Sequence, residues 1–266
     1  MSTPATHYQI IAHNYSFDSD NKIHSDDVAK EYGFKGGLVP GVADFAYLAR
    51  ATYDHWGEAW LSGGTIEAKF IKPVYHGETA FAAATPSDEP DTLTLALTNV
   101  DGVLCAAGSA TLAGAGTAPS PAAFRSFPLP AEDARPAPDI ATFPAGTQLG
   151  AYEYDFDAST ATQEAVEKFV DAWPSTARWH PAIALHDANR ILRANVALGP
   201  WIHTASKLDL FGAPVTGERV SLRGNVLNTF ERRGHVMTEL DLGVFAADRP
   251  IARVKHTAII RLSGTA

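Results

Sequence analysis

A polar stretch between residues 16 and 41 holds the side chains best suited to chemistry. It combines an amide, an imidazole and several carboxylates: Asp18, Asp20, Asn21, His24, Asp26 and Asp27. A histidine near its ordinary pKa exchanges protons readily at neutral pH, so His24 is the candidate proton carrier. Purely structural roles are also possible for these residues. His24 could brace the loop, and Asp18 and Asp20 could be solvated. Asp26-Asp27 could cap a short helix from Val28 to Tyr32.

The other reactive side chains do not form a site in the sequence. Cys105 is the only cysteine and lies in an apolar run, so we interpret it as a small buried hydrophobe rather than a nucleophile. Four further histidines lack metal-ligand spacing with acidic neighbours: His13, His76, His203 and His256. We therefore expect no metal.

The polar stretch ends at Val39-Pro40-Gly41, directly before a segment with helical periodicity. From Val42 to Trp56, apolar and small residues recur on one face: Phe45, Leu48, Ala49, Thr52 and Trp56. Pro40 suits the start of a helix, where its missing N–H is not needed. A second helical segment, Ile183 to Val196, follows His180-Pro181-Ala182 in the same way.

Strand-like runs follow each helical segment and are separated by turn signals. The turns fall at Ser87–Pro90 and Val100–Gly102 in the first half, and at Arg232–Gly234 and Ala247–Pro250 in the second. Both halves thus read as a strand, a loop, a long helix and a four-strand antiparallel meander. This matching order favours a duplication over two unrelated α+β domains.

A stretch rich in Pro and Ala, residues 114–147, separates the two halves. Proline removes backbone donors and fixes φ, so we expect an extended connector there. The predicted organisation is an N-terminal repeat over 1–113, this linker, and a degenerate C-terminal repeat over 148–266. The fold class is α+β.

The polar stretch resembles the hydratase motif of the MaoC-like, or (R)-specific enoyl-thioester hydratase and dehydratase, family. The matching positions are Asn21, His24, Asp26, Ala29, Gly33, Phe34 and Gly41. The resemblance implies a double hotdog fold, in which two long helices are each wrapped by a curved antiparallel sheet. It covers nearly the whole chain.

The chemistry of that family needs a base, an acid and donors for a thioester carbonyl oxygen. By resemblance, His24 transfers protons, Asn21 orients the loop or a water, and the N–H of Gly41 polarises the carbonyl. The family's catalytic Asp falls on Ser19 here, so Asp20, or else Asp18, is predicted to replace it; the alternative is that the carboxylate is absent and the activity altered. The implied substrate-binding residues are Asp18, Ser19, Gly37, Val39 and Pro40.

The second half carries no such motif. Its corresponding loop, Ser159 to Arg178, lacks both Asn-x-x-His and Gly-Phe. We therefore expect this repeat to be catalytically silent and to shape one wall of a tunnel.

The resemblance implies a hydro-lyase, an enoyl-CoA hydratase or 3-hydroxyacyl-CoA dehydratase. Its substrate would be an acyl thioester of coenzyme A or of a carrier protein. Coenzyme A would enter only as part of the substrate, and no other cofactor is expected. Two alternatives remain: an acyl-CoA thioesterase, and a non-catalytic acyl-thioester-binding protein.

Composition limits the partners. The 266 residues carry a net charge of -9 and no basic run, which argues against nucleic-acid binding. No stretch has membrane-spanning length, and the first fifteen residues lack a secretion-signal pattern, so we expect a cytoplasmic protein. A monomeric pseudo-dimer and a homodimer are both compatible with the duplication.

Overall fold

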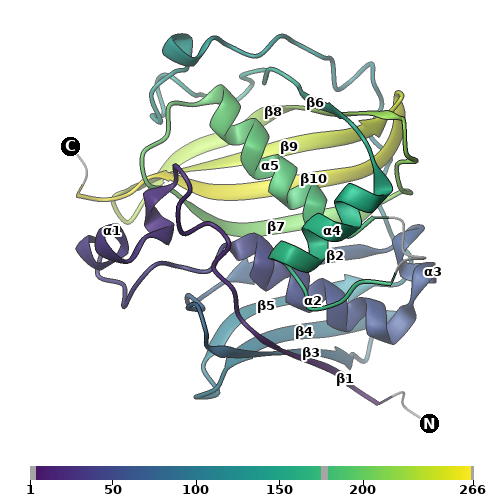
Figure 1. The fold of residues 1–266 in the computed structure, drawn as a ribbon. Helices are drawn as coiled ribbons and strands as arrows, with labels where there is room; N and C mark the ends of the chain where they lie inside the picture. Colours follow the sequence, from purple (N-terminus) through teal and green to yellow (C-terminus); the bar gives the residue numbers. More distant parts are fainter. Residues whose placement is uncertain (1–3, 175–178, 265–266) are drawn as a thin grey trace.

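One antiparallel sheet runs through the whole molecule in the computed structural model, which describes residues 4–174 and 179–264. Ten strands of the described chain form it in the order β1-β3-β4-β5-β2-β7-β10-β9-β8-β6 (Figure 1). The strands are β1 (Thr6–Ile11), β2 (Thr65–Phe70), β3 (Thr79–Pro86), β4 (Thr92–Asn99), β5 (Leu104–Thr111), β6 (Tyr152–Asp155), β7 (Ile202–Leu210), β8 (Arg219–Arg232), β9 (His235–Ala246) and β10 (Arg249–Arg261).

The strand order is the same when counted from either edge of the sheet. In each half the first strand is at the edge, followed by the third, fourth, fifth and second. The halves join where β2 pairs with β7, and Glu67 lies opposite Lys207 at the centre of that pairing. This order agrees with the predicted duplication, while the exact boundaries of the two repeats remain a prediction.

The four strands after each helix do not form the simple meander that the sequence predicts. Strands β3, β4 and β5 do, but β2 lies beyond β5. The segment 71–78 carries the chain from β2 back toward β1, where the N–H of Ala12 donates to Glu78 O and that of Gly77 to Ala12 O, both at 2.8 Å. This crossing leaves the other edge of β2 free to pair with β7.

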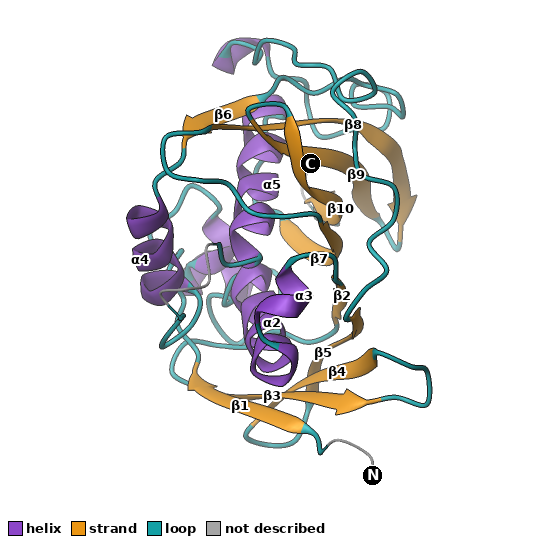
Figure 2. Ribbon diagram, turned by 90° about the vertical axis from the view of Figure 1, so that its right-hand side faces the viewer, coloured by secondary structure: helices purple, strands orange, loops and turns teal. Residues whose placement is uncertain are grey.

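Two helices lie together on the inner face of the curved sheet, α2 (Gly41–Trp56) and α5 (Ala182–Asn195) (Figure 2). Each begins one residue before the predicted segment. Phe45 and Leu48 of α2 are fully buried, as their periodicity predicts. Three shorter helices complete the described set: α1 (Asp26–Glu31), α3 (Glu58–Leu61) and α4 (Ala158–Lys168).

Helix α4 occupies part of the stretch from Ser159 to Arg178, for which the sequence predicts a loop. Asp157 starts this helix, because its Oδ1 accepts a hydrogen bond from the N–H of Thr160 at 2.8 Å. Residues 175–178 of the stretch lie outside the described residues.

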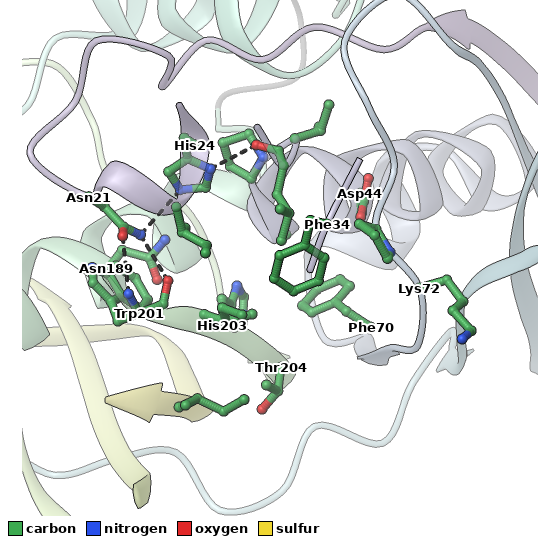
Figure 3. A pocket seen from close by; sticks show the side chains of 18 of the residues that line it. Asn21, His24, Phe34, Asp44, Phe70, Lys72, Asn189, Trp201, His203 and Thr204 are labelled. Carbon is green, nitrogen blue, oxygen red and sulfur yellow. Dashed lines mark hydrogen bonds between the residues drawn. The ribbon is translucent and has the colours of Figure 1, made fainter. Parts of the chain in front are cut away.

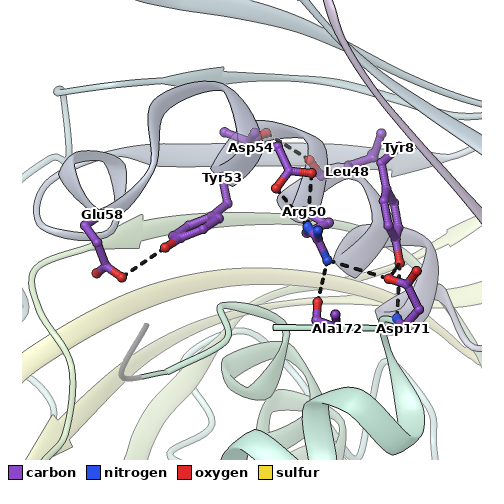
Figure 4. A network of polar contacts seen from close by, with 9 residues as sticks. Tyr8, Leu48, Arg50, Tyr53, Asp54, Glu58, Asp171 and Ala172 are labelled. Atoms are coloured by element: carbon purple, nitrogen blue, oxygen red, sulfur yellow. Dashed lines mark hydrogen bonds and ion pairs between the residues drawn. The ribbon is translucent and has the colours of Figure 1, made fainter. Parts of the chain in front are cut away.

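The segment after α4 is tied to the first half of the chain (Figure 4). The hydroxyl of Tyr8 donates to Asp171 Oδ1 at 2.7 Å. The guanidinium of Arg50, on α2, donates to Ala172 O and lies 3.6 Å from the same Asp171 oxygen. These contacts hold the second half against β1 and α2.

The linker, residues 114–147, packs along the second half. Its only described helical element is a 3-10 turn at Glu132–Ala134, in keeping with the predicted extended connector. The ring of Phe143 is fully buried, and Asp139 accepts a hydrogen bond from Arg261 at 2.7 Å. None of the described helices is both long and apolar enough to span a membrane.

Candidate active site

His24 ends a 3-10 turn, Lys22–His24, and its ring is held in one orientation. Nδ1 lies 2.8 Å from Leu38 O. Because a carbonyl oxygen only accepts, Nδ1 carries the proton and Nε2 keeps its lone pair in the neutral ring. Burial lowers the pKa of His24, although the bond to Leu38 O opposes that shift. The neutral form is therefore favoured near pH 7.

Glycine at position 37 allows the loop to fold tightly behind His24. A Cβ at Gly37 would lie 2.0 Å from the carbonyl oxygen of His24, which no side chain can tolerate. That same oxygen accepts a hydrogen bond from Asn14 Nδ2 at 2.8 Å. Gly37 thus supports the histidine from outside the cavity, whereas a substrate-binding role was predicted for it.

Asn21 connects the loop to the second half of the chain. Its Oδ1 accepts from the N–H of Trp201 at 3.1 Å, and its Nδ2 donates to Trp201 O at 3.0 Å. The second hydrogen of Nδ2 is directed at His24 Nε2, 3.3 Å away. Asn21 therefore orients the loop, one of the two roles that the family resemblance implies for it.

A cavity of about 220 Å³ opens beside His24 (Figure 3). Its walls come from the loop at 21–24, the start of α2, the segment 70–73, α5 and the start of β7. Of the predicted substrate-binding residues, Val39 and Pro40 line it, as does Gly41, for which a catalytic role was predicted. No side chain caps α2, and the N–H of Ala43 donates to Pro40 O at 2.8 Å. The N–H groups of Gly41 and Val42 have no hydrogen-bond partner within the described chain, and Gly41 lines the cavity.

The predicted carboxylates do not reach this cavity. The side chain of Asp20 is 88% exposed and pairs with Arg193, while Asp18 is exposed as well. The hydroxyl of Ser19 donates to the backbone oxygen of Asn21 at 3.4 Å. Because Asn21 is anchored on Trp201, the residues before it lie on the outer side of the loop. The prediction of Asp20 as the catalytic carboxylate is therefore corrected.

Asp26 also differs from its predicted role as a helix cap. The helix begins at Asp26 itself, two residues before Val28. The Oδ1 atom of Asp26 accepts a hydrogen bond from the N–H of Gly37 at 2.7 Å. Asp26 thus braces the glycine that supports His24.

Asp44 is the carboxylic acid that does line the cavity. It lies in the first turn of α2, is 3% exposed, and its Oδ1 has no hydrogen-bond partner within the described chain. Burial raises its pKa well above the ordinary value. Asp44 is not among the predicted site residues, although an acid inside the apolar segment from Val42 to Leu48 is a signal that the sequence offers.

Two further polar side chains reach the cavity from the second half. The Oδ1 of Asn189 on α5 and the Nδ1 of His203 on β7 are buried, and neither has a hydrogen-bond partner in the described chain. Burial lowers the pKa of His203 well below its ordinary value, and the neighbouring His256 adds to this shift. By contrast, Cys105 is fully buried away from the cavity, as predicted, and burial raises the pKa of its thiol to about 11.

In the second half, the first N–H of the equivalent helix, α5, is already hydrogen-bonded. Pro181 and Ala182 begin α5 as Pro40 and Gly41 begin α2, but here His180 Nδ1 accepts a hydrogen bond from the N–H of Ala182 at 3.1 Å. The nearby side chain of Trp179 is almost fully buried and lines a separate depression, to which neither Pro181 nor Ala182 contributes. The free amide that a substrate carbonyl would need is thus already bonded, which supports the expectation of a silent second repeat.

Comparisons by sequence find no matching family model and no matching curated protein. The fold, however, is similar to solved structures. A MaoC-like dehydratase aligns over 97% of this chain and 98% of its own, with a TM-score of 0.57 and 11% identity. RV0216 from Mycobacterium tuberculosis, described as a double hotdog, aligns over 97% and 96%, with a TM-score of 0.60 and 13% identity.

A third similar structure is assigned as an oleoyl thioesterase of Lactobacillus plantarum. It aligns over 99% of this chain and 97% of its own, with a TM-score of 0.57 and 13% identity. At such identities the likeness shows the fold alone. The chain has the double hotdog fold that the motif resemblance implies, and proteins with this fold include both dehydratases and thioesterases.

Proposed function

We propose that this double-hotdog chain is a hydro-lyase that hydrates enoyl thioesters, or dehydrates 3-hydroxyacyl thioesters in the reverse direction. One observation carries the proposal. The imidazole of His24, the carboxyl of Asp44 and the uncapped start of α2 line the same cavity. These are the base, the acid and the carbonyl-polarising donor that the reaction needs.

The two titratable groups have pKa values shifted in opposite directions, which suits them to opposite roles. Burial favours neutral His24 and protonated Asp44, which can donate a proton. The Nε2 lone pair of His24 can accept a proton once its 3.3 Å contact with Asn21 Nδ2 is exchanged for the substrate water. In hydration, His24 takes a proton from water as the oxygen bonds to Cβ, and Asp44 gives its proton to Cα. Transfer of the proton from His24 to Asp44 through solvent restores both groups.

The start of α2 would bind the thioester carbonyl. The N–H of Gly41 sits at the positive end of the helix, where negative charge develops on the carbonyl oxygen during the reaction. The acyl chain would lie against the apolar wall, where Phe34, Phe70 and Trp201 lie. The carrier, coenzyme A or a carrier protein, would remain outside, and no other cofactor takes part in the proposal.

The test is the hydration of a panel of trans-2-enoyl-CoA thioesters, followed by mass spectrometry. We expect wild-type turnover, a loss of about 10²–10⁴-fold in kcat for His24→Ala and for Asp44→Asn, and folded variants by circular dichroism. Asp20→Asn is the matched control and should keep wild-type activity. Undiminished hydration by His24→Ala would refute the proposal.

The same samples separate the alternative functions. Release of free thiol from acyl-CoA, detected with a thiol reagent, identifies a thioesterase, as one of the structurally similar proteins is assigned. Binding of acyl-CoA by calorimetry without any product by mass spectrometry identifies a non-catalytic binding protein. Either result would replace the hydro-lyase proposal.

A further inference from the structure

His203 belongs to the second half but lies next to the start of α2. A Cβ built on Gly41 would lie 3.3 Å from His203 Nδ1 and 3.1 Å from the ring of Phe70. The histidine is 6% exposed, lines the cavity, and its Nδ1 has no hydrogen-bond partner in the described chain. Figure 3 places it on the cavity wall between Trp201 and Phe70. The backbone of Ala205 also lies near this ring and opposes the downward shift of its pKa, but Nδ1 makes no hydrogen bond of acceptable geometry in the described chain. A buried polar nitrogen without a partner therefore stands beside Gly41.

The other ring nitrogen of His203 belongs to a chain of three buried side chains. His203 Nε2 lies 2.8 Å from Ser206 Oγ, which lies 3.1 Å from His256 Nδ1. Burial lowers the pKa of His256 to about 3, so both rings are neutral near pH 7. Ser206 Oγ has no other hydrogen-bond partner in the described chain, so its single hydrogen is used only when it donates to one ring and accepts from the other.

This chain allows only two proton arrangements. In the first, Ser206 donates to His203 Nε2 and accepts from His256 Nδ1, so His203 carries its proton on Nδ1, at the cavity. In the second, every bond is reversed and the bare Nδ1 lone pair is at the cavity. A negatively charged oxygen beside Gly41 selects the first arrangement, because only that one supplies it with an N–H donor.

We propose that His203 Nδ1–H is a second donor to the thioester carbonyl oxygen, acting with the N–H of Gly41 on the same atom. The oxyanion site is then assembled from both halves: the backbone of α2 and a side chain of β7. Ser206 and His256 touch neither the substrate nor the cavity, and act as positioning residues that hold the required tautomer. This inference rests on the proposed function, since it names a further part of the same site.

Two substitutions at position 203 separate the donor from the ring. His203→Asn keeps an N–H near the place of Nδ1, and His203→Leu removes it. Loss of one oxyanion donor typically lowers kcat by about 10²–10³-fold. We therefore expect such a loss for His203→Leu at nearly unchanged KM, with partial recovery of kcat in His203→Asn. Ser206→Ala should lower kcat less, because the donor remains but its tautomer is no longer imposed.

A spectroscopic measurement tests the contact without turnover. [1-¹³C]crotonyl-CoA is bound to His24→Ala, to His24→Ala/His203→Leu and to His24→Ala/His203→Asn, and the carbonyl stretch is recorded by infrared difference spectroscopy. We expect a lower frequency in the first and third proteins than in the second. Equal frequencies in all three, together with unchanged kcat in His203→Leu, would overturn the inference while leaving hydration itself intact.

Two further outcomes are also decisive. Where His203→Leu does not fold, ¹⁵N NMR of histidine-labelled His24→Ala with bound crotonyl-CoA decides the tautomer. A protonated Nδ1 on His203 supports the inference and an unprotonated one overturns it.

The two proposals can also fail separately. A wild-type protein that fails to hydrate the panel, but binds crotonyl-CoA with a lowered carbonyl stretching frequency, would refute the hydro-lyase proposal and leave the carbonyl contact standing.

Discussion

At the scale of single residues, the site depends on two side chains whose burial shifts their pKa values in opposite directions. Burial lowers the pKa of His24 and raises that of Asp44, because the charged form of either group is poorly solvated there. In water the pKa of the histidine would be higher than it is here, and that of the aspartic acid would be lower. These opposite shifts suit the two residues to the proposed roles of base and acid.

The pH dependence of hydration follows from these two shifts. We expect kcat/KM to fall at acidic pH as His24 becomes protonated, at a pH below the ordinary histidine value of about 6.5. It should also fall at higher pH as Asp44 loses its proton, through a pKa raised well above 3.8. Steady-state rates measured across the pH range check both limbs. An acid limb centred above 6.5 would contradict the assignment of His24.

The unpartnered acid should also reduce stability. A carboxyl whose pKa is raised on folding stabilises the folded state only while it is protonated, so its cost grows as the pH rises above the unfolded value of 3.8. Asp44→Asn should therefore raise the free energy of unfolding at pH 7.5 by about 1 kcal/mol, or roughly 2–4 °C, and by less at pH 4.

Thermal unfolding of both proteins at the two pH values measures this difference. Asp20→Asn is again the matched control, because that carboxylate is exposed. A lower melting temperature for Asp44→Asn at pH 7.5 would mean that the acid has a stabilising partner.

At the scale of elements, the two helix starts explain why one repeat carries the site. The start of α2 has no side-chain cap, whereas His180 binds the first N–H of α5. Burial lowers the pKa of His180 to about 3, so its ring stays a neutral acceptor across the physiological range. The first N–H of the helix is thus free in one repeat and already hydrogen-bonded in the other.

The loop before α2 supplies a prediction at this scale. Gly37→Ala would place a Cβ within 2.0 Å of His24 O, and only a shift of the loop can relieve that clash. We expect a loss of about 1–3 kcal/mol in stability and a marked loss of hydration, because His24 moves with its backbone. Denaturant unfolding and kcat measure the two effects.

Gly63 provides the control for that substitution. A Cβ at Gly63 would meet no atom within 4 Å. Gly63→Ala should therefore be much milder than Gly37→Ala. Equal effects of the two substitutions would show that the tight approach behind His24 is unimportant.

At the scale of the whole molecule, neither repeat contains the site by itself. The cavity has walls from both halves, Asn21 is anchored on Trp201, and Asp171 is held by Tyr8 and Arg50. The sheet is continuous through the pairing of β2 with β7. The two repeats therefore depend on each other for both structure and chemistry.

This dependence predicts a single cooperative unfolding transition. Urea unfolding should give the same midpoint by far-ultraviolet circular dichroism, which reports both halves, and by tryptophan fluorescence, which is weighted toward the second half through Trp173, Trp179 and Trp201. Two separated midpoints would mean that the repeats fold as independent domains.

Patterns among neighbouring residues were enough to predict the local features of this chain. Helical periodicity located α2 and α5 to within a residue, turn signals located the hairpins, and the motif around Asn21 and His24 indicated the loop that borders the cavity. These patterns are local, because backbone geometry relates residues a few positions apart.

The set of side chains that share the cavity, by contrast, follows from how the two repeats pack. The anchoring of Asn21 on Trp201, 180 positions away, leaves Asp20 in solvent, while Asp44 and His203 meet at the cavity from different halves. Likewise β2 pairs with β7 rather than with its neighbour along the chain. Such contacts depend on how the two repeats pack, and spacing along the chain does not encode them.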